Sequence, residues 1–168
     1  WSSDVCSSDL AAVGLYQGAV VFVAAEPEDD PADVERLEVL WRGVGGEPYR
    51  VSPAEHDSLV ARTSHALHLV AAAAVRAYLG RDKSDLATGG AFRDFSRIAA
   101  SSPDMWTEIS KFNRPHLTAA LKELELEIAK VRTLVDLQDW TALRAYLDLA
   151  REQREAWFAE WSRRKEQR

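Results

Sequence analysis

The chain has 168 residues, of which 46% are hydrophobic and 29% are charged, so it is long enough to bury a hydrophobic core. Its net charge of -6 argues against a general binder of nucleic acid or of an acidic membrane surface, and an anionic substrate would need a local cationic site. Cys6 is the only cysteine, which excludes an internal disulfide, and no cluster in the sequence has the spacing of a zinc site.

The first ten residues, WSSDVCSSDL, differ in character from the rest of the chain and resemble a translated sequencing adapter. Because Met105 is the only methionine, Trp1 is not a natural translation start, and we expect residues 1–10 to be a non-native tail. A polar native tail is the alternative. The segment lacks the features of a secretory signal, and the most apolar run, residues 69–75, is too short to span a membrane. These observations favour a cytoplasmic protein.

Residues 11–51 have the pattern of a small α/β segment. Residues 19–25, AVVFVAA, are apolar and rich in β-branched side chains, which predicts a buried strand. Residues 31–44 carry apolar side chains at helical spacing after the candidate N-cap Asp30, and a second strand is expected at residues 47–51. This order predicts one crossover unit of a parallel sheet. One such unit is too small for a domain, so neighbouring strands are expected elsewhere.

The chain after residue 51 is predicted to be wholly helical, and its first helix begins at Ser52 and Pro53 and ends at Gly80. Four further helices are expected at residues 91–99, from residue 103, at residues 115–137 and at residues 140–165. Ser102 and Asp139 are the candidate N-caps of the second and the last of these helices.

Apolar side chains of the 115–137 helix form a seam in which spacings of four and three residues alternate. The seam consists of Leu117, Leu121, Leu124, Ile128, Val131 and Val135. It has to be buried, either in the core of an intramolecular bundle or in an interface between subunits. The last helix carries Trp140, Trp157 and Trp161, and large aromatic side chains near a chain end favour subunit packing.

Two histidines lie within the first long helix. His65 and His68 are three residues apart, so they project from neighbouring parts of one face. They are either core residues whose polar atoms are satisfied by the backbone, or residues that line a site. His56 precedes His65 by nine residues and falls on the opposite side of the helix, so a three-histidine metal site is not expected.

A charged pair, Asp94 and Arg97, lies in the segment GGAFRDFSRIA of residues 89–99. Their spacing of three residues allows an ion pair on one helical face. Such a pair would hold the guanidinium in place, and its planar fork suits a carboxylate ligand. The alternative is an exposed pair with no function, worth well under ~1 kcal/mol of stability.

Four segments taken together resemble the prephenate/arogenate dehydrogenase family. They are EHD (55–57), SHALH (64–68), GGAFRDFSRIA (89–99) and SPDMW (102–106), in the order and spacing of the family segments HD, SHLPH, GGFRDxTRIA and DPxxW. The resemblance covers residues 14–150. The family has a proline where this chain has Leu67, and we expect its absence to straighten the helix and to shift His68 slightly.

The resemblance implies that the substrate is bound by Arg97, His65, His68, Trp106 and Gly90. It also implies that Asp94 supports Arg97 as its ion-pair partner. It implies an NAD- or NADP-dependent oxidative decarboxylation of prephenate or arogenate in tyrosine biosynthesis. Neither a GxGxxG motif nor the family's catalytic histidine is present. The cofactor is therefore expected to bind mainly to a region outside this sequence. No catalytic, cofactor-binding or metal-binding residue is expected within it, and the chain alone is expected to be inactive.

The expected fold is mainly α. Residues 11–51 would be the C-terminal end of a Rossmann-type nucleotide-binding α/β domain, and residues 52–168 an all-α domain for substrate binding and dimerisation. The expected partners are the small-molecule substrate and a second copy of the chain, without nucleic acid or membrane. Two alternatives stay open: a non-catalytic helical dimerisation module, and another two-domain NAD-dependent dehydrogenase, against which SHALH and FRDFSRIA speak.

Overall fold

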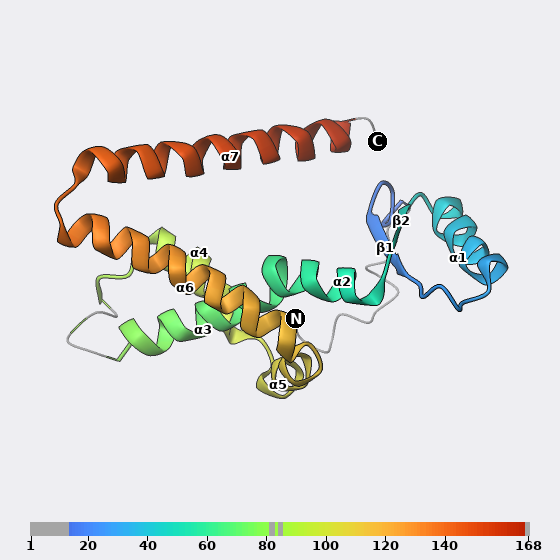
Figure 1. Ribbon diagram of the computed structural model, residues 1–168, viewed down its shortest axis with the longest axis horizontal. Helices are drawn as coiled ribbons and strands as arrows, with labels where there is room; N and C mark the ends of the chain where they lie inside the picture. The colour runs from blue at the N-terminus through green and yellow to red at the C-terminus, as the bar shows by residue number, and fades with distance from the viewer. Residues whose placement is uncertain (1–13, 81–82, 84–85, 167–168) are drawn as a thin grey trace. The chain divides into compact units, whose positions relative to one another are not determined.

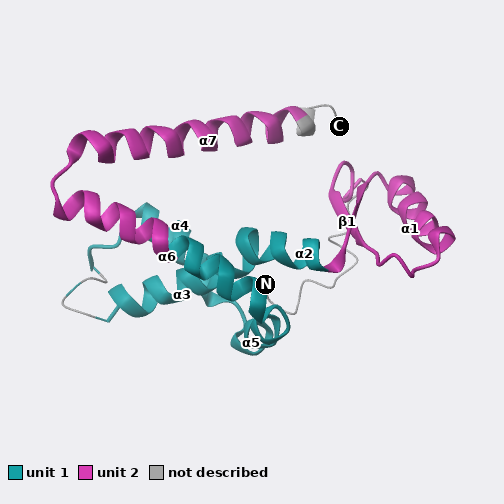
Figure 2. Ribbon diagram, viewed as in Figure 1, with its two compact units in different colours: residues 1, 54–124 teal, residues 2–53, 125–168 magenta. Residues whose placement is uncertain are grey.

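The computed structural model describes residues 14–80, 83 and 86–166. The predicted tail at residues 1–10 lies outside the described residues. The described chain divides into two compact units (Figure 2), of which unit 1 contains residues 54–124 and unit 2 contains residues on either side of it, up to 53 and from 125.

The N-terminal segment of unit 2 is the predicted strand–helix–strand crossover (Figure 1). Strands β1 (Val20–Ala24) and β2 (Glu47–Val51) pair in parallel along their whole length. Helix α1 (Pro31–Gly43) connects them, and the carboxylate of Asp30 caps it by accepting a hydrogen bond from the backbone N–H of Ala32 at 2.9 Å. The mainly helical fold with a small parallel sheet confirms the predicted fold class.

The prediction that β1 is a buried strand is wrong for one of its faces. Val23 is buried, whereas Val20 and Phe22 are exposed. Side chains alternate between the two faces of a strand, and in this two-stranded sheet α1 packs against one face. The apolar run therefore predicted the strand correctly, but it did not predict that one face of the strand is exposed in this chain.

Unit 1 is built on one continuous helix, residues Pro53–Tyr78. It consists of α2 (Pro53–Val60), the π-helical segment η3 (Ala61–His65) and α3 (Ala66–Tyr78). The π-helical turn ends two residues before Leu67, where the family has a proline, and Leu67 itself lies in the regular helix α3. Single π-helical turns in an α-helix are frequent at functional sites.

Among the described residues, this is the one helix that is long and apolar enough to cross a membrane. Ala61, Ala66 and Ala71 of this helix are buried, and the first two belong to the hydrophobic core of unit 1.

Shorter and longer helices follow in chain order. They are α4 (Gly90–Ser96), the 3-10 segment η5 (Arg97–Ala100), α5 (Pro103–Phe112), α6 (Arg114–Asp136) and α7 (Trp140–Glu166). Ser102 caps α5 as predicted, because its hydroxyl accepts a hydrogen bond from the backbone N–H of Met105 at 3.4 Å. Asp139 caps α7 in the same way through the N–H of Ala142 at 3.0 Å.

The core of unit 1 forms where α6 packs against the long helix. Its buried members are Ala61, Ala66, Leu117 and Ala120, and Leu69 and Leu121 pack against them. Leu117 of α6 packs among the small alanine side chains of this core. A two-pronged ion pair joins the same helices, since Arg62 donates two hydrogen bonds of 3.0 Å to the carboxylate of Glu123.

The two halves of the α6 seam differ in burial. Leu117 is 4% exposed and Leu121 packs against the core, so the first half is buried within unit 1. In unit 2, Ile128 is 57% exposed and Val135 is 45% exposed. The second half of the seam therefore presents an apolar surface in the single chain.

Leu117→Ala should lower the free energy of unfolding by about 2–5 kcal/mol, because it leaves a cavity between α6 and the alanines of the long helix. Leu59→Ala is the matched control, since Leu59 is 39% exposed and its truncation leaves no enclosed cavity. Urea denaturation followed by circular dichroism measures both. Equal losses for the two variants would contradict the packing described for Leu117.

Candidate active site

Three aromatic side chains predicted for the substrate pocket meet in unit 1. Trp106 of α5 stacks on His68 of α3, with ring centroids 3.7 Å apart and planes inclined by 23°. His65 of η3 meets the same indole edge-on at 5.9 Å and 73°. The structure therefore brings together His65, His68 and Trp106, which lie up to 41 positions apart in the sequence.

Asn113, between α5 and α6, joins this cluster to the start of the long helix. It is 5% exposed, and its side-chain nitrogen donates a hydrogen bond to the backbone carbonyl of Asp57 at 2.8 Å. The same nitrogen lies 3.1 Å from Nδ1 of His65. Sequence reasoning missed Asn113, and no local signal marks it, because its partners are distant in the sequence.

The electrostatic environment favours a neutral His65. Burial lowers the pKa of His65 below its ordinary value of 6.5, and the neighbouring imidazoles of His56 and His68 act in the same direction, while Asp57 opposes them. The ring of His68 is held differently, since its Nδ1 lies 3.0 Å from the backbone carbonyl of Ser64, one turn earlier.

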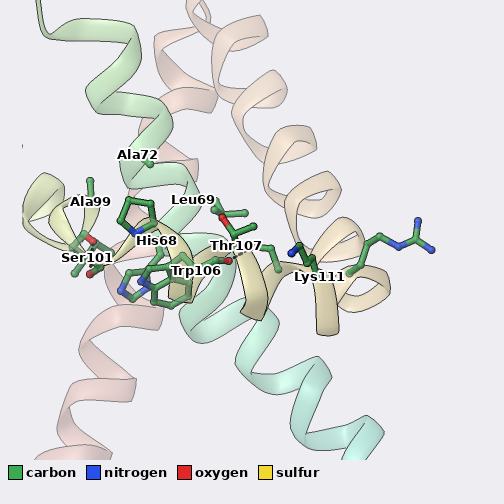
Figure 3. A pocket seen from close by; sticks show the side chains of 12 residues that line it. His68, Leu69, Ala72, Ala99, Ser101, Trp106, Thr107 and Lys111 are labelled. Carbon is green, nitrogen blue, oxygen red and sulfur yellow. Dashed lines mark hydrogen bonds between the residues drawn. The ribbon is translucent and has the colours of Figure 1, made fainter.

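A pocket of about 520 Å³ opens beside His68 and Trp106 (Figure 3). It is lined by His68, Leu69, Ala72, Ile98, Ala99, Ser101, Pro103, Trp106, Thr107, Ser110, Lys111 and Arg114. Its walls are mostly apolar, with a few polar groups, which is typical of a small-molecule site. The indole N–H of Trp106 is buried and has no hydrogen-bond partner among the described residues.

Lys111 and Arg114 bring positive charge to this pocket, and sequence reasoning missed both. Lys111 also forms an ion pair with Glu108. The spacing of four residues places Thr107 and Lys111 on one side of α5, whereas Arg114 begins the next helix, α6, so helical spacing gives no signal for it. The pocket thus combines an apolar wall with cations, although the chain as a whole is acidic.

A second pocket, of about 340 Å³, adjoins the opposite part of the cluster. It is lined by Asp57, His65, Met105, Glu108, Ile109, Phe112 and Asn113. The two pockets share no lining residue, so His65 and His68 line different ones although both contact Trp106.

The predicted ion pair between Asp94 and Arg97 is not formed. Asp94 instead contacts the neighbouring Arg93 at 3.3 Å, and both side chains are largely exposed. Exposed pairs are worth little, so helical spacing alone does not decide which of two nearby arginines an aspartate contacts. Arg97 begins η5, is exposed, and has no ion pair among the described residues.

Two predicted residues do not line either pocket described above. Arg97 precedes Ile98 and Ala99, which line the larger pocket, but its own side chain is not part of the wall. Gly90 lies in the first turn of α4 and is exposed, with no atom near the position of a Cβ. The structure therefore shows no close backbone approach that would require glycine at position 90.

The strand–helix crossover of unit 2 does not fit a dinucleotide. The loop between β1 and α1 reads AEPEDD, with four acidic residues and no glycine. Dinucleotide sites at such a loop use glycines to bring backbone N–H groups close to the pyrophosphate, and acidic side chains would repel it. Among the described residues there is also no group of three potential metal ligands.

Comparison with known proteins identifies the family. The family described as "Prephenate dehydrogenase, dimerization domain" matches residues 52–149, which are more than half of the chain and contain the whole aromatic cluster. The chain belongs to the prephenate dehydrogenase family. The predicted resemblance is confirmed.

Individual relatives agree with this assignment. Prephenate dehydrogenase of Bacillus subtilis is 33% identical over 146 residues, which cover 84% of this chain and 39% of the relative. The crystal structure of Synechocystis arogenate dehydrogenase matches with a TM-score of 0.79 and 26% identity, over 89% of this chain and 56% of that one. The chain therefore spans well under two thirds of the length of these relatives.

A third similar protein carries ligands. The structure of Aquifex aeolicus prephenate dehydrogenase in complex with hydroxyphenyl propionate and NAD+ matches with a TM-score of 0.81 and 27% identity, over 88% of this chain and 53% of that one. That enzyme therefore binds a nicotinamide cofactor and an aromatic carboxylate.

His65 should titrate with a midpoint below 6.5, because burial disfavours its charged form. The unfolded chain then binds more protons than the folded chain at mildly acidic pH, so stability should fall as pH drops below about 6.5 and level off below the folded midpoint. NMR titration of the imidazole signals measures the midpoint, and His65→Gln assigns the signal. A midpoint at or above 6.5 would contradict the effect of burial.

Proposed function

We propose that this chain supplies the substrate-binding and dimerising part of a cytoplasmic, NAD- or NADP-dependent prephenate or arogenate dehydrogenase. The observation that carries the proposal is the stacking of Trp106 on His68, with His65 edge-on, beside an apolar pocket that contains two cationic side chains. The family match over residues 52–149 supports the same conclusion. The acidic β1–α1 loop is a poor site for the cofactor, which we assign to a part of the enzyme outside this sequence.

The proposed substrates suit this combination of groups. Prephenate carries two carboxylates and a hydroxyl group on a cyclohexadiene ring, and its oxidation with loss of CO2 gives the aromatic 4-hydroxyphenylpyruvate. The apolar wall and the indole of Trp106 would hold the ring, while cationic side chains would hold carboxylates. Hydroxyphenyl propionate, bound by the Aquifex aeolicus relative, likewise combines a six-membered carbon ring with a carboxylate, which supports this class of ligand.

Within this chain, the work is binding and orientation. Fixing the ring in one pose lowers the entropic cost of reaching the transition state, and enclosing it keeps water away. A nicotinamide cofactor, bound outside the described residues, would supply the hydride acceptor. We assign no catalytic base to the described residues.

Arg97 is our proposed ligand for a substrate carboxylate. Its guanidinium is exposed and has no ion pair among the described residues, so its donors are available. Asp94 contacts Arg93 instead, and its supporting role would require a change of partner on substrate binding.

In the intact enzyme, Arg97→Ala should raise KM for prephenate about 10- to 150-fold, because a charge-assisted hydrogen bond of ~1.5–3 kcal/mol is lost. Arg93→Ala is the matched control: it removes the neighbouring exposed arginine, which pairs with Asp94, and should leave KM nearly unchanged. Steady-state kinetics measure KM for both variants. Equal KM values for Arg97→Ala and the parent enzyme would rule out the carboxylate role.

The proposed partner is a second copy of the chain. The matching family is described as a dimerization domain, and the second half of the α6 seam exposes apolar side chains in the single chain. In unit 2, α6 and α7 are joined by a hydrogen bond of 3.1 Å from the hydroxyl of Tyr146 to Glu127. Packing of two copies across Ile128 and Val135 would remove this apolar surface from water.

Ile128→Glu should convert the proposed homodimer to monomers, since it places a charge in the centre of the exposed seam. Thr133→Glu introduces the same side chain at an exposed polar position on the side of α6 away from the seam and should leave the dimer intact. Size-exclusion chromatography with light scattering reports the mass of each variant. A dimer that persists in Ile128→Glu would place the interface elsewhere.

A further inference from the structure

The hydrogen-bond partners of His65 and His68 determine which ring nitrogen of each carries the proton. In a neutral imidazole, one nitrogen donates a hydrogen bond and the other accepts one. A ring nitrogen that faces a backbone carbonyl has to donate, because the carbonyl oxygen can only accept. A ring nitrogen that faces an N–H group has to accept. The protonation pattern therefore follows from the partners.

One orientation of the Asn113 amide satisfies both neighbours of its nitrogen, and it leaves the buried Oδ1 without a hydrogen-bond partner among the described residues. Its nitrogen lies 2.8 Å from the backbone carbonyl of Asp57, and an amide oxygen at that position would place two acceptors against each other. The amide nitrogen carries a second hydrogen, and Nδ1 of His65 lies 3.1 Å away. Because Asn113 is 5% exposed, water has little access to replace either bond. Nδ1 of His65 therefore accepts, and Nε2 carries the proton.

His68 has the opposite arrangement. Its Nδ1 lies 3.0 Å from the backbone carbonyl of Ser64, so this nitrogen donates. In the neutral ring, Nε2 then bears a lone pair. The two imidazoles contact the same indole, that of Trp106, yet they offer different groups to a ligand.

We infer that Asn113 is a positioning residue that fixes His65 as an Nε2–H donor, while the Ser64 carbonyl fixes His68 as an Nε2 acceptor. His65 then offers a donor in the smaller pocket that it lines, and His68 offers an acceptor in the larger pocket that it lines. A hydroxyl or ammonium donor on a ligand suits the larger pocket, and an oxygen acceptor suits the smaller one. The ligand class rests on the proposed function, whereas the two proton positions do not.

Long-range proton–nitrogen NMR on the nitrogen-15-labelled chain tests the proton positions directly, at about pH 8, where an ordinary histidine is neutral. The expected spectrum shows His65 protonated at Nε2 and His68 protonated at Nδ1. In Asn113→Asp the new side chain can only accept, so the proton of His65 should move to Nδ1 while the pattern of His68 stays unchanged. His68 thus serves as an internal control in every spectrum.

A second variant covers the case in which Asn113→Asp does not fold. Asn113→Ala removes the donor without adding a charge, and the nitrogen signals of His65 should shift toward the average of the two tautomers. A parent chain with the proton of His65 on Nδ1, or an unchanged His65 pattern in a folded Asn113 variant, would overturn the inference.

Titration of the parent chain with hydroxyphenyl propionate then tests the ligand separately. A shift of the Nε2 signals of His65 and His68 on titration supports the proposed substrate site. If the proton positions are as inferred and neither signal shifts in the intact enzyme with its cofactor, the proposed function fails while the role of Asn113 stands.

Discussion

Close contact between α6 and the long helix is the constraint on which unit 1 depends. Ala61 and Ala66 are small enough for Leu117 to fill the space between the helices. Because α6 is held there, the turn that precedes it brings Asn113 against Asp57 and His65. A larger side chain at either alanine would push α6 away and separate these partners.

The same packing explains how residues distant in the sequence form one cluster. Helix α5 ends just before Asn113, so fixing that turn also fixes α5 and carries Trp106 to His68. The π-helical turn ends at His65, within the segment that the cluster uses. The geometry of the candidate site therefore depends on the core packing. A substitution that weakens the contact between α6 and the long helix should also disturb the contacts among His65, His68 and Trp106.

Charged side chains are distributed unevenly: cationic side chains line a pocket in unit 1, and acidic side chains gather in the β1–α1 loop. The chain has a net charge of -6, but the larger pocket in unit 1 includes Lys111 and Arg114. The loop between β1 and α1 carries four acidic residues instead of a glycine-rich turn. The described chain is thus suited to an anionic small molecule in unit 1 and unsuited to a pyrophosphate at this loop.

Local signals in the sequence predicted the elements well. Asp30, Ser102 and Asp139 cap the helices that they were expected to cap, because a cap depends only on neighbouring backbone atoms. Helical spacing placed His65 and His68 on one face, and the family resemblance added Trp106.

Features that depend on tertiary structure were not predictable in the same way. The partner of Asp94 is one of two nearby arginines, and the energy difference between them is too small for spacing to decide. Asn113 acts on residues 48 and 56 positions away, so only the packed helices reveal its role. The exposure of one face of β1 likewise depends on how many elements cover the sheet.

The crystal structure of the intact enzyme with bound hydroxyphenyl propionate is the most direct test of the account. We expect the ligand ring to lie against Trp106 and to contact at least one of His65 and His68. We expect the ligand carboxylate to bind the guanidinium of Arg97. A ligand bound elsewhere, while His65, His68 and Trp106 keep their mutual contacts, would contradict the assignment of unit 1 as the substrate-binding part.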